Sequence, residues 1–554
     1  MSDHEPTIPP MRRRDFLTKI GVVGGAGALY ATMDALGIVA SPTNAPAAWA
    51  KEARAWRPPS ASDFGLRGTG RGTNVLVVGA GIAGLVTAYE LGKAGYRVTI
   101  VEARERPGGR NWTVRNGTVE TEIGGTPQRA SFSSDQYMNA GPGRIAQHMV
   151  TLDYCRELGV PVEVFTNQNA DGYYYQEDVG ALSGRKIRHR TAKADVYGYV
   201  SELLAKATDA GALDERLTAE DKERLISFLQ SFGAIGPKRA GDAAGSYAYT
   251  GSDRRGYVVD KGAGTQAGEI LAPPFALTDV LQSQIGNYFA FEFAWDQAML
   301  MFQPVGGMDR IPYALERAVL EQGCEIHYGL PVQQIANTAD GVEVTVQRGS
   351  QHPRVLSGDY AVCTIPPQVL KNVTSNFSQP VRDALAFAVP TPASKIGLEF
   401  SRRFWEEDEN LMGGITNTNM DLSAMWYPSY GYLGRRGTLI GYYNMGANAL
   451  AYGERSIPDR LARAIAQGKK IHGDAYEEEL LSSFSVSWQK IRYSEGGWVE
   501  WPSHTSGEYE RLLAPEANVY FAGDHLSYYS SWQAGAIDSA RLAVTALHAR
   551  ALAG

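Results

Sequence analysis

A glycine-rich turn between a buried strand and a helix constrains this chain more than any other feature. Residues 74–78, Asn-Val-Leu-Val-Val, have the character of the strand, and Gly79, Gly81 and Gly84 follow in the spacing Gly-x-Gly-x-x-Gly. The first glycine permits a sharp turn, the second lets the backbone approach a pyrophosphate, and the third lets the helix pack on the strand. Amide groups at the start of the helix then stabilise the bound anion. The turn therefore predicts a phosphate cradle.

A second strand and an acidic residue follow at the separation expected for a dinucleotide-binding unit. Residues 96–101, Tyr-Arg-Val-Thr-Ile-Val, end at Glu102, whose carboxylate can accept hydrogen bonds from a ribose. A glycine turn alone is a weak signal, but strand, turn, helix, strand and acid in register favour nucleotide binding over a structural turn. We therefore expect an α/β fold that contains a Rossmann-like domain.

The length and charge of the chain narrow the class of protein. With 554 residues it is too long for a single core, so roughly two or three domains are expected. The net charge of -7 is mild and no basic stripe carries interleaved aromatic residues, which argues against a nucleic-acid partner. The cysteines, at 155, 324 and 363, are too scattered for a disulfide framework, and no HExxH-type pairing of histidines occurs. We therefore expect no metal.

The first fifty residues have the order of an export signal. Three arginines at 12–14 precede Asp-Phe-Leu and a weakly apolar stretch from 20 to about 33, and small residues follow at 45–50. This order resembles a twin-arginine signal, for which a disordered basic tail is the alternative. The apolar stretch is short for a membrane span, so we expect export to the periplasm or the exterior without stable membrane insertion. Residues 51–73 have the composition of a linker or arm.

An arginine- and glycine-rich segment follows Glu102. Residues 104–110 read Arg-Glu-Arg-Pro-Gly-Gly-Arg, which by themselves indicate an anion-binding loop, with a solvated turn as the alternative. The segment resembles the RxGGR motif of flavin-dependent amine oxidases. This resemblance implies FAD as the cofactor, with the arginines and the glycine backbone holding its diphosphate and the edge of the isoalloxazine.

A further arginine indicates the kind of substrate. Residues 139–144, Asn-Ala-Gly-Pro-Gly-Arg, place Arg144 where turn chemistry gives way to a helical pattern. Its guanidinium could hold a carboxylate through two parallel hydrogen bonds, or pair locally. The segment resembles the GPxR motif of L-amino-acid oxidases, whose arginine binds the substrate α-carboxylate. Because monoamine and polyamine oxidases act on substrates without a carboxylate, Arg144 favours the L-amino-acid oxidase branch.

Two strands in the second half of the chain carry further candidates. Lys395, in the alternating run 393–400, matches the family lysine that holds a water next to flavin N5, with an exposed strand as the alternative. In the amino-acid oxidases a tyrosine from the strand at 438–444 touches the substrate. Tyr442 and Tyr443 point to opposite faces, and the sequence does not decide between them.

The last two motifs lie near the C-terminus. The segment at 487–498 resembles one that passes the flavin at Trp488 and closes the substrate's variable end at Trp498, with aromatic core packing as the alternative. A strand then ends in Gly-Asp, and in the family an acid at Asp524 bonds the flavin ribityl or pyrophosphate region. Trp532 is expected beside the isoalloxazine, and Ser531 stands where many relatives have glycine.

The resemblance covers about residue 70 to the C-terminus and implies a complete set of site residues. Catalytic roles fall to Lys395, Arg144 and Trp532, and substrate contacts to Arg144, Tyr442, Tyr443, Trp498, Ser531 and Trp532. Cofactor contacts are expected from Gly79, Gly81, Ala83, Gly84, Glu102, Ala103, Arg104, Gly109, Arg110, Gly141, Pro142, Gly143, Arg144, Val332, Trp488, Gly523, Asp524, Trp532 and Ala534. Candidate walls for a large apolar or aromatic side chain are Trp498, Trp426, Tyr427 and Phe293.

The same resemblance implies a discontinuous organisation. The FAD-binding domain is expected to comprise 74–125, 300–390 and 515–554. A mixed-sheet substrate domain is expected to comprise 126–189, 271–299 and 391–514. Residues 190–270 show helical spacing with charged outer positions and are expected to form a helical insertion.

The implied reaction is oxidative deamination of an L-amino acid by FAD and dioxygen to a 2-oxo acid, ammonia and hydrogen peroxide. The FAD should be non-covalent, because no cysteine follows Cys363 to form a thioether. An amino-acid 2-monooxygenase giving a carboxamide, a monoamine or polyamine oxidase, and a non-catalytic flavoprotein are the alternatives. We expect a homo-oligomer, such as a dimer.

Overall fold

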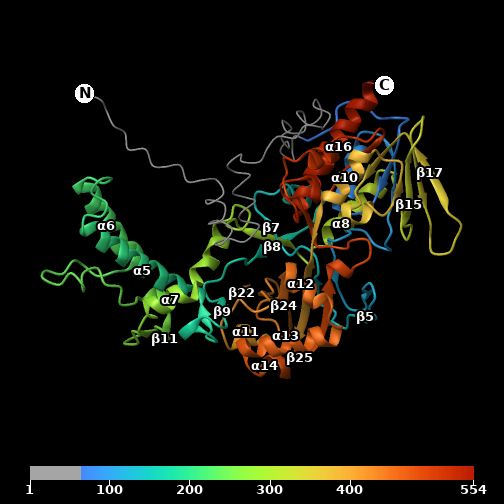
Figure 1. Ribbon diagram of the computed structural model, residues 1–554. Coiled ribbons are helices and arrows are strands. Elements are labelled where there is room, and N and C mark those ends of the chain that lie inside the picture. Colours follow the sequence, from blue (N-terminus) through green and yellow to red (C-terminus); the bar gives the residue numbers. More distant parts are fainter. Residues whose placement is uncertain (1–63, 554) are drawn as a thin grey trace, which may run out of the picture.

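The computed structural model describes residues 64–553 (Figure 1). The expected export signal at 1–50 and most of the expected arm therefore lie outside the described residues. Within residues 64–553, no helix is both long and apolar enough to cross a membrane. The oligomeric state and the domain limits given above stay predictions.

A five-stranded parallel sheet organises one half of the molecule, and its strands come from distant parts of the chain. Each neighbouring pair runs parallel. In spatial order the strands are β14 (Glu325–His327), β2 (Arg97–Val101), β1 (Asn74–Val78), β18 (Tyr360–Cys363) and β27 (Val519–Phe521). The strand before the glycine turn, β1, and the strand near the C-terminus, β27, thus lie in one sheet, on either side of β18.

The central strand is apolar because both faces of this sheet are covered. Val75 and Val77 pack into a core shared with α3 (Ile82–Lys93), α8 (Arg310–Glu321) and α16 (Gln533–Ala553). Leu76 and Val78 point the other way, into a second core. Elements of that second core include β15 (Val332–Asn337), β16 (Val342–Val346), α10 (Gln379–Phe387) and α15 (Gly507–Leu513). A strand buried on both faces has no polar alternation, as expected for parallel sheets.

A second, seven-stranded sheet forms the other half. In spatial order it comprises β10 (Ile187–Arg188), β9 (Tyr173–Tyr175), β22 (Gly414–Thr418), β23 (Ala424–Tyr427), β24 (Gly437–Met445), β21 (Ala393–Phe400) and β25 (Leu480–Ser487). The sheet is mixed, because β9 runs parallel to β22 while β21 to β25 pair antiparallel. Helix α13 (Ile457–His472) adds Ala464 and Ile471 to a core on one face of this sheet, and the other face is turned to the cavity described below.

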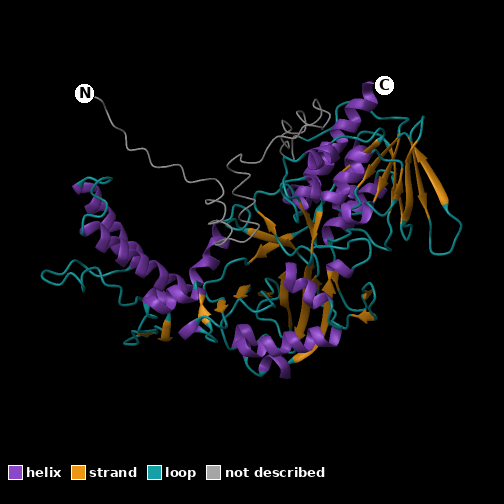
Figure 2. Cartoon of the chain, viewed as in Figure 1, coloured by secondary structure: helices purple, strands orange, loops and turns teal. Residues whose placement is uncertain are grey.

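A helical excursion leaves the second sheet after β10. It contains α5 (His189–Asp209), α6 (Ala219–Gly233), α7 (Leu277–Ser283) and the 3-10 segment η4 (Ile285–Phe293). Figures 1 and 2 show α5 and α6 as a helical arm directed away from both sheets. The chain returns through β13 (Met301–Pro304), so the last part of the excursion runs back to the body of the protein. It is this returning part that reaches the cavity.

Candidate active site

A cavity of about 640 Å³ lies between the two sheets. One end is formed by the turns that follow β1 and β2, and includes Gly79, Gly81 and Glu102. The other end is formed by side chains of the mixed sheet, among them Lys395 and Tyr443. Ligands of open α/β sheets bind outside the carboxyl ends of the parallel strands, and the cavity begins there.

The glycine turn is shaped as the sequence predicts. Gly79 has a φ of +108°, which favours glycine, and a Cβ at Gly84 would lie 1.9 Å from the Gly79 carbonyl oxygen. At Gly81, by contrast, a Cβ would meet no atom within 4 Å. The N-terminus of α3 has no side-chain cap, so its amides are left for a ligand. The turn therefore fits a phosphate group, as the sequence motif requires.

Glu102 is fixed at the edge of this turn. One of its carboxylate oxygens accepts from the Ala80 amide and the other from the Arg104 amide, each at 2.8 Å. Arg104 Nη1 also lies 4.0 Å from Glu102 Oε1, while its Nη2 donates to the Arg492 carbonyl and to Ser494 Oγ, each at 2.7 Å. Glu102 is thus oriented by backbone groups and retains lone pairs for a ribose.

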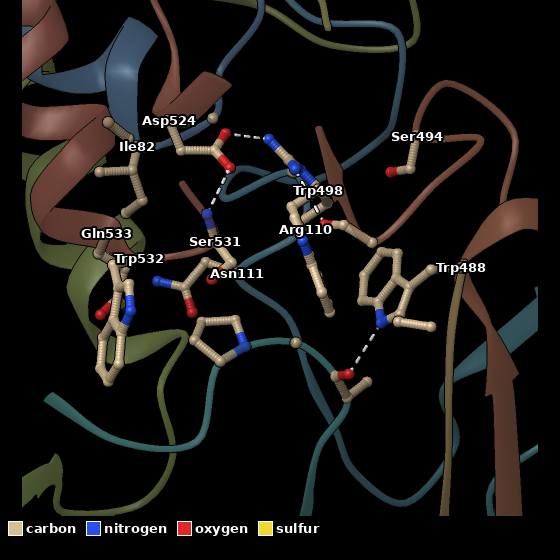
Figure 3. Close-up of a pocket in the computed structure, with 18 of the residues that line it drawn as sticks. Ile82, Arg110, Asn111, Trp488, Ser494, Trp498, Asp524, Ser531, Trp532 and Gln533 are labelled. Atoms are coloured by element: carbon tan, nitrogen blue, oxygen red, sulfur yellow. Dashed lines mark hydrogen bonds and ion pairs between the residues drawn. The ribbon is translucent and has the colours of Figure 1, made fainter. Parts of the chain in front are cut away.

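The C-terminal motif closes the same end of the cavity. Arg110 pairs with Asp524, and the Ser531 amide donates to the other Asp524 oxygen at 3.2 Å (Figure 3). Arg110 also donates to the Gly497 carbonyl at 2.9 Å. Ser531 has a φ of +71°, a conformation that favours glycine. This explains why glycine suits the position that serine occupies here.

Most of the expected cofactor residues line the cavity. They are Gly79, Gly81, Ala83, Glu102, Ala103, Arg104, Gly109, Arg110, Gly141, Pro142, Gly143, Arg144, Val332, Trp488, Gly523, Asp524 and Trp532. Gly84 packs beneath the turn, and Ala534 lies in the core of the first sheet. Gln533 and Ala536 face the cavity from the start of α16 in its place. Neighbouring residues in the first turn of a helix face different directions, some toward the core and some toward the cavity. A motif match alone does not tell which residue faces which way.

Arg144 is buried at the end of the cavity that the mixed sheet forms, with an exposed fraction of 9%. Its Nη2 donates to Gln297 Oε1 at 2.7 Å, and its guanidinium lies 4.4 Å from the centre of the Trp426 ring. The buried Nε and Nη1 have no hydrogen-bond partner among the described residues. Burial lowers the pKa of Arg144 to about 10, so the group remains a cation at neutral pH.

Lys395 is the second buried cation of this end. Its Nζ donates to the Gly141 carbonyl and lies 4.4 Å from the centre of the Tyr443 ring. Burial, followed by repulsion from Arg144, lowers the pKa of Lys395 to about 7. The inward orientation expected from the resemblance is therefore present, and the group can change protonation state near neutrality.

The structure separates the two tyrosines of β24. Tyr443 lines the cavity. Tyr442 faces the opposite core, where its hydroxyl is 2.8 Å from Ser485 Oγ and its ring packs against Tyr452. Of the two substrate candidates, Tyr442 is therefore removed from the site. Its position follows from the alternation of side chains along a strand.

Of the residues expected to form walls around a substrate side chain, some line the cavity and others do not. Trp426 lines the cavity, but Tyr427 lies on the other face of β23, within hydrogen-bond distance of His472 Nε2. Phe293 is 74% exposed and is not in the lining, whereas Phe291 is. The position of Tyr427 follows from the alternation of side chains along β23, whereas Phe293 is the last residue of the 3-10 segment η4.

Trp498 lines the cavity. It follows Gly497, whose carbonyl accepts from Arg110, and Figure 3 places its ring beside Arg110. Trp488 donates its Nε1 proton to the Ala140 carbonyl at 2.9 Å. Trp498 thus lies near the Arg110–Asp524 pair, and its expected role at the variable end of a substrate stays a prediction.

Several lining residues carry no motif and escaped sequence reasoning. They are Tyr288, Phe291, Asp296 and Gln297 from the returning excursion, and Asn417, Thr418, Ser423 and Met445 from the mixed sheet. The excursion residues lie in an aromatic-rich stretch, and its sequence does not indicate that it packs against the cavity. Their contribution depends on contacts between segments far apart in the chain.

Comparison with known proteins assigns the chain to a family. The family model described as flavin containing amine oxidoreductase matches residues 82–548. The chain belongs to this family. Because the family is flavin-containing, it implies FAD as the cofactor.

Individual relatives agree with this assignment. A putative L-amino-acid oxidase of Bacillus subtilis is 28% identical over 500 residues, which cover 86% of this chain and 94% of that protein. An L-amino-acid oxidase of Gloydius halys is 25% identical over 487 residues, covering 84% and 87%. The structure of cyclohexylamine oxidase from Brevibacterium oxydans IH-35A superposes with a TM-score of 0.54 at 17% identity, covering 86% of this chain and 99% of that one. This last likeness is one of fold.

Proposed function

We propose that the protein oxidises L-amino acids to 2-oxo acids, with release of ammonia and reduction of dioxygen to hydrogen peroxide. The observation that carries the proposal is Arg144, a buried guanidinium with two unpartnered nitrogens at the lining of the cavity. A buried cation in this state favours an anionic ligand, and a carboxylate matches guanidinium geometry. The similarity to L-amino-acid oxidases supports the same substrate class.

The residues present fit FAD. The Gly79–Gly81 turn and the amides of α3 would hold its diphosphate, Glu102 a ribose, and the Arg110–Asp524 pair the region between diphosphate and ring. Bound FAD supplies the acceptor for the hydride that leaves the substrate Cα, and passes the two electrons to dioxygen. The free cysteines are buried and none of them lines the cavity, which supports non-covalent binding.

The chain's own residues orient the substrate and exclude water. Arg144 would fix the α-carboxylate, while the rings of Trp426, Tyr443 and Trp532 form apolar walls around the reacting carbon. Holding the Cα–H bond in one direction is the main contribution that such a site can make. Lys395, with its pKa near 7, is suited to hold or pass a proton beside them.

The walls favour a large apolar or aromatic side chain. Ile415, Trp426, Met445 and Phe291 contribute apolar surface to the lining, while Asn417 provides an amide on the same sheet face. Burial of apolar surface would provide most of the affinity for the side chain. The carboxylate would provide orientation.

The substitution Arg144→Met tests the proposal. We expect the KM for L-phenylalanine or L-leucine to rise at least about 30-fold, because a truncated buried charge pair costs roughly 2–5 kcal/mol. The FAD content should stay unchanged. Equal loss of FAD and activity would make Arg144 architectural and contradict the proposal.

Product analysis separates the related reactions. Peroxide and a 2-oxo acid are the expected products, whereas a carboxamide would indicate a monooxygenase. A primary amine without a carboxylate is the matched substrate control. If the wild-type protein oxidised that amine better than any L-amino acid, and Arg144→Met left its KM unchanged, the protein would be an amine oxidase instead.

A further inference from the structure

The Arg144 guanidinium is held from a part of the chain to which no motif assigns a role. Gln297, which accepts from Arg144 Nη2 at 2.7 Å, stands 153 residues further along the chain. It lies just beyond η4, in the returning part of the helical excursion, and lines the same cavity. The excursion therefore reaches the site through this side chain.

The backbone around Gln297 is fixed in place. The Ala294 carbonyl accepts from the amides of Gln297 and Ala298, at 2.9 and 2.8 Å, which closes a tight turn. From the body of the protein, Asn167 Nδ2 donates to the Gln297 carbonyl at 3.0 Å. The side chain is thus delivered to Arg144 from an anchored position.

The orientation of the amide is also determined. Gln297 Nε2 donates to Asp296 Oδ2 at 3.4 Å, which leaves Oε1 for the guanidinium. The ring of Trp426, 4.4 Å from the guanidinium, supports its face. One hydrogen bond and one stacking contact together define the plane of Arg144. Because Gln297 occupies one nitrogen, Nε and Nη1 remain for a ligand.

We propose that Gln297 is a positioning residue that sets the plane of the Arg144 guanidinium for the substrate carboxylate. The inference rests on the proposed function, since it assumes a carboxylate substrate. A neutral amide suits this role, because it accepts a hydrogen bond without neutralising the cation. A carboxylate at the same position would form an internal ion pair and compete with the substrate.

The substitution Gln297→Glu exploits this difference. We expect the KM for an L-amino acid to rise roughly 10- to 100-fold, because the ion pair between Arg144 and the new carboxylate competes with the substrate carboxylate for the guanidinium. The kcat at saturation should change less than about threefold, since the carboxylate clamp acts in binding. Gln297→Ala should raise KM less, by roughly three- to tenfold, through loss of orientation alone.

A binding measurement without turnover accompanies the kinetics. Benzoate, a carboxylate with no amine, is titrated into each holoenzyme and its Kd is read from the flavin absorbance. The Kd should follow the same order, with Gln297→Glu weakest, then Gln297→Ala, then wild type. Gln282→Glu is the matched control, because Gln282 is exposed on the same excursion and lies outside the cavity lining. It should leave KM and Kd unchanged.

The outcomes separate this inference from the proposed function. If Arg144→Met weakens benzoate binding but Gln297→Glu and Gln297→Ala behave as wild type, the role of Gln297 is overturned and the carboxylate site stands. A loss of kcat and FAD in both Gln297 variants with KM unchanged would also overturn it, as a structural effect. If Arg144→Met leaves benzoate binding and KM unchanged, both proposals fall.

Discussion

The two ends of the cavity differ in whether their arginine and lysine side chains have ion-pair partners. At the nucleotide end, Arg110 pairs with Asp524, and Arg104 donates to a backbone carbonyl and a serine hydroxyl. At the substrate end, Arg144 and Lys395 are buried to at least the same degree, yet neither forms an ion pair with any residue in the range 64–553. Their hydrogen-bond acceptors are a neutral amide and main-chain carbonyls.

This difference indicates which groups would stabilise the negative charge of a ligand at each end. At the nucleotide end, the glycine turn and the helix amides face the diphosphate, and the arginine is already neutralised. At the substrate end, a buried cation without a counter-ion is costly, so an anionic ligand would relieve that cost on binding. The charges of one end are therefore balanced within the protein, and on the proposed function those of the other are balanced by the substrate carboxylate.

Exchanging the arginine of the nucleotide end is the most disruptive test of this comparison. Arg110→Met would leave the Asp524 carboxylate buried without its ion-pair partner. We expect the free energy of unfolding to fall by about 3–5 kcal/mol and the FAD-to-protein ratio to drop with it. Denaturant unfolding and flavin absorbance measure both. A variant that kept its FAD and its stability would erase the distinction from Arg144.

The glycines of the turn sharpen the same contrast. A Cβ at Gly84 would collide with the Gly79 carbonyl, so Gly84→Ala should cost about 1–3 kcal/mol of stability or more. A Cβ at Gly81 would enter open space, so Gly81→Ala should fold normally and lose FAD affinity instead. Melting temperature without added FAD and a flavin titration distinguish the two. Equal effects on both measurements would contradict a backbone cradle.

The charge on Lys395 should make ligand binding depend on pH. The pKa of Lys395 is lowered to about 7, so the group is a cation below that pH and neutral above it. Benzoate should therefore bind roughly three- to tenfold more tightly at about pH 6 than at about pH 8, because an anion favours the protonated lysine. In Lys395→Met this step should disappear. A step of unchanged size in that variant would assign the titration to another group.

The smallest expected effects distinguish the two tyrosines of β24. Tyr443→Phe removes a hydroxyl at the cavity and should change the KM for an L-amino acid by a few-fold. Tyr442→Phe removes a hydrogen bond to Ser485 in the opposite core and should lower stability by about 1 kcal/mol with KM unchanged. The reverse pattern would place Tyr442 at the site.

Local motifs explain what the sequence could predict. The strands β1 and β2, the glycine turn and Glu102 are neighbours in the chain, so spacing alone brings them together. Arg144 and Lys395 were identified by resemblance, and both are found at one cavity. Each depends on a short segment whose conformation is set by nearby residues.

The remaining features depend on registers and contacts that the sequence does not show. The side-chain alternation of β24 was ambiguous because both faces of the strand are largely buried. A register shift opposite Ile396 and Gly397 breaks simple counting as well, since Ile396 pairs with Tyr442 and Gly397 with Ile440. Gln297 contacts Arg144 because the excursion folds back to the body of the protein, and the sequence of this returning segment has no periodic pattern that would predict the contact.

The order of strands in the parallel sheet has a consequence for biosynthesis. The strand β27 forms one edge of the sheet, beside β18, and follows the other four strands in the sequence. Asp524 follows it directly, so the partner of Arg110 reaches the ribosome's peptidyl-transferase centre more than four hundred residues after Arg110 itself. Flavin capture must therefore await the synthesis of Asp524, because a nascent chain that stops short of this residue still lacks one wall of its binding site.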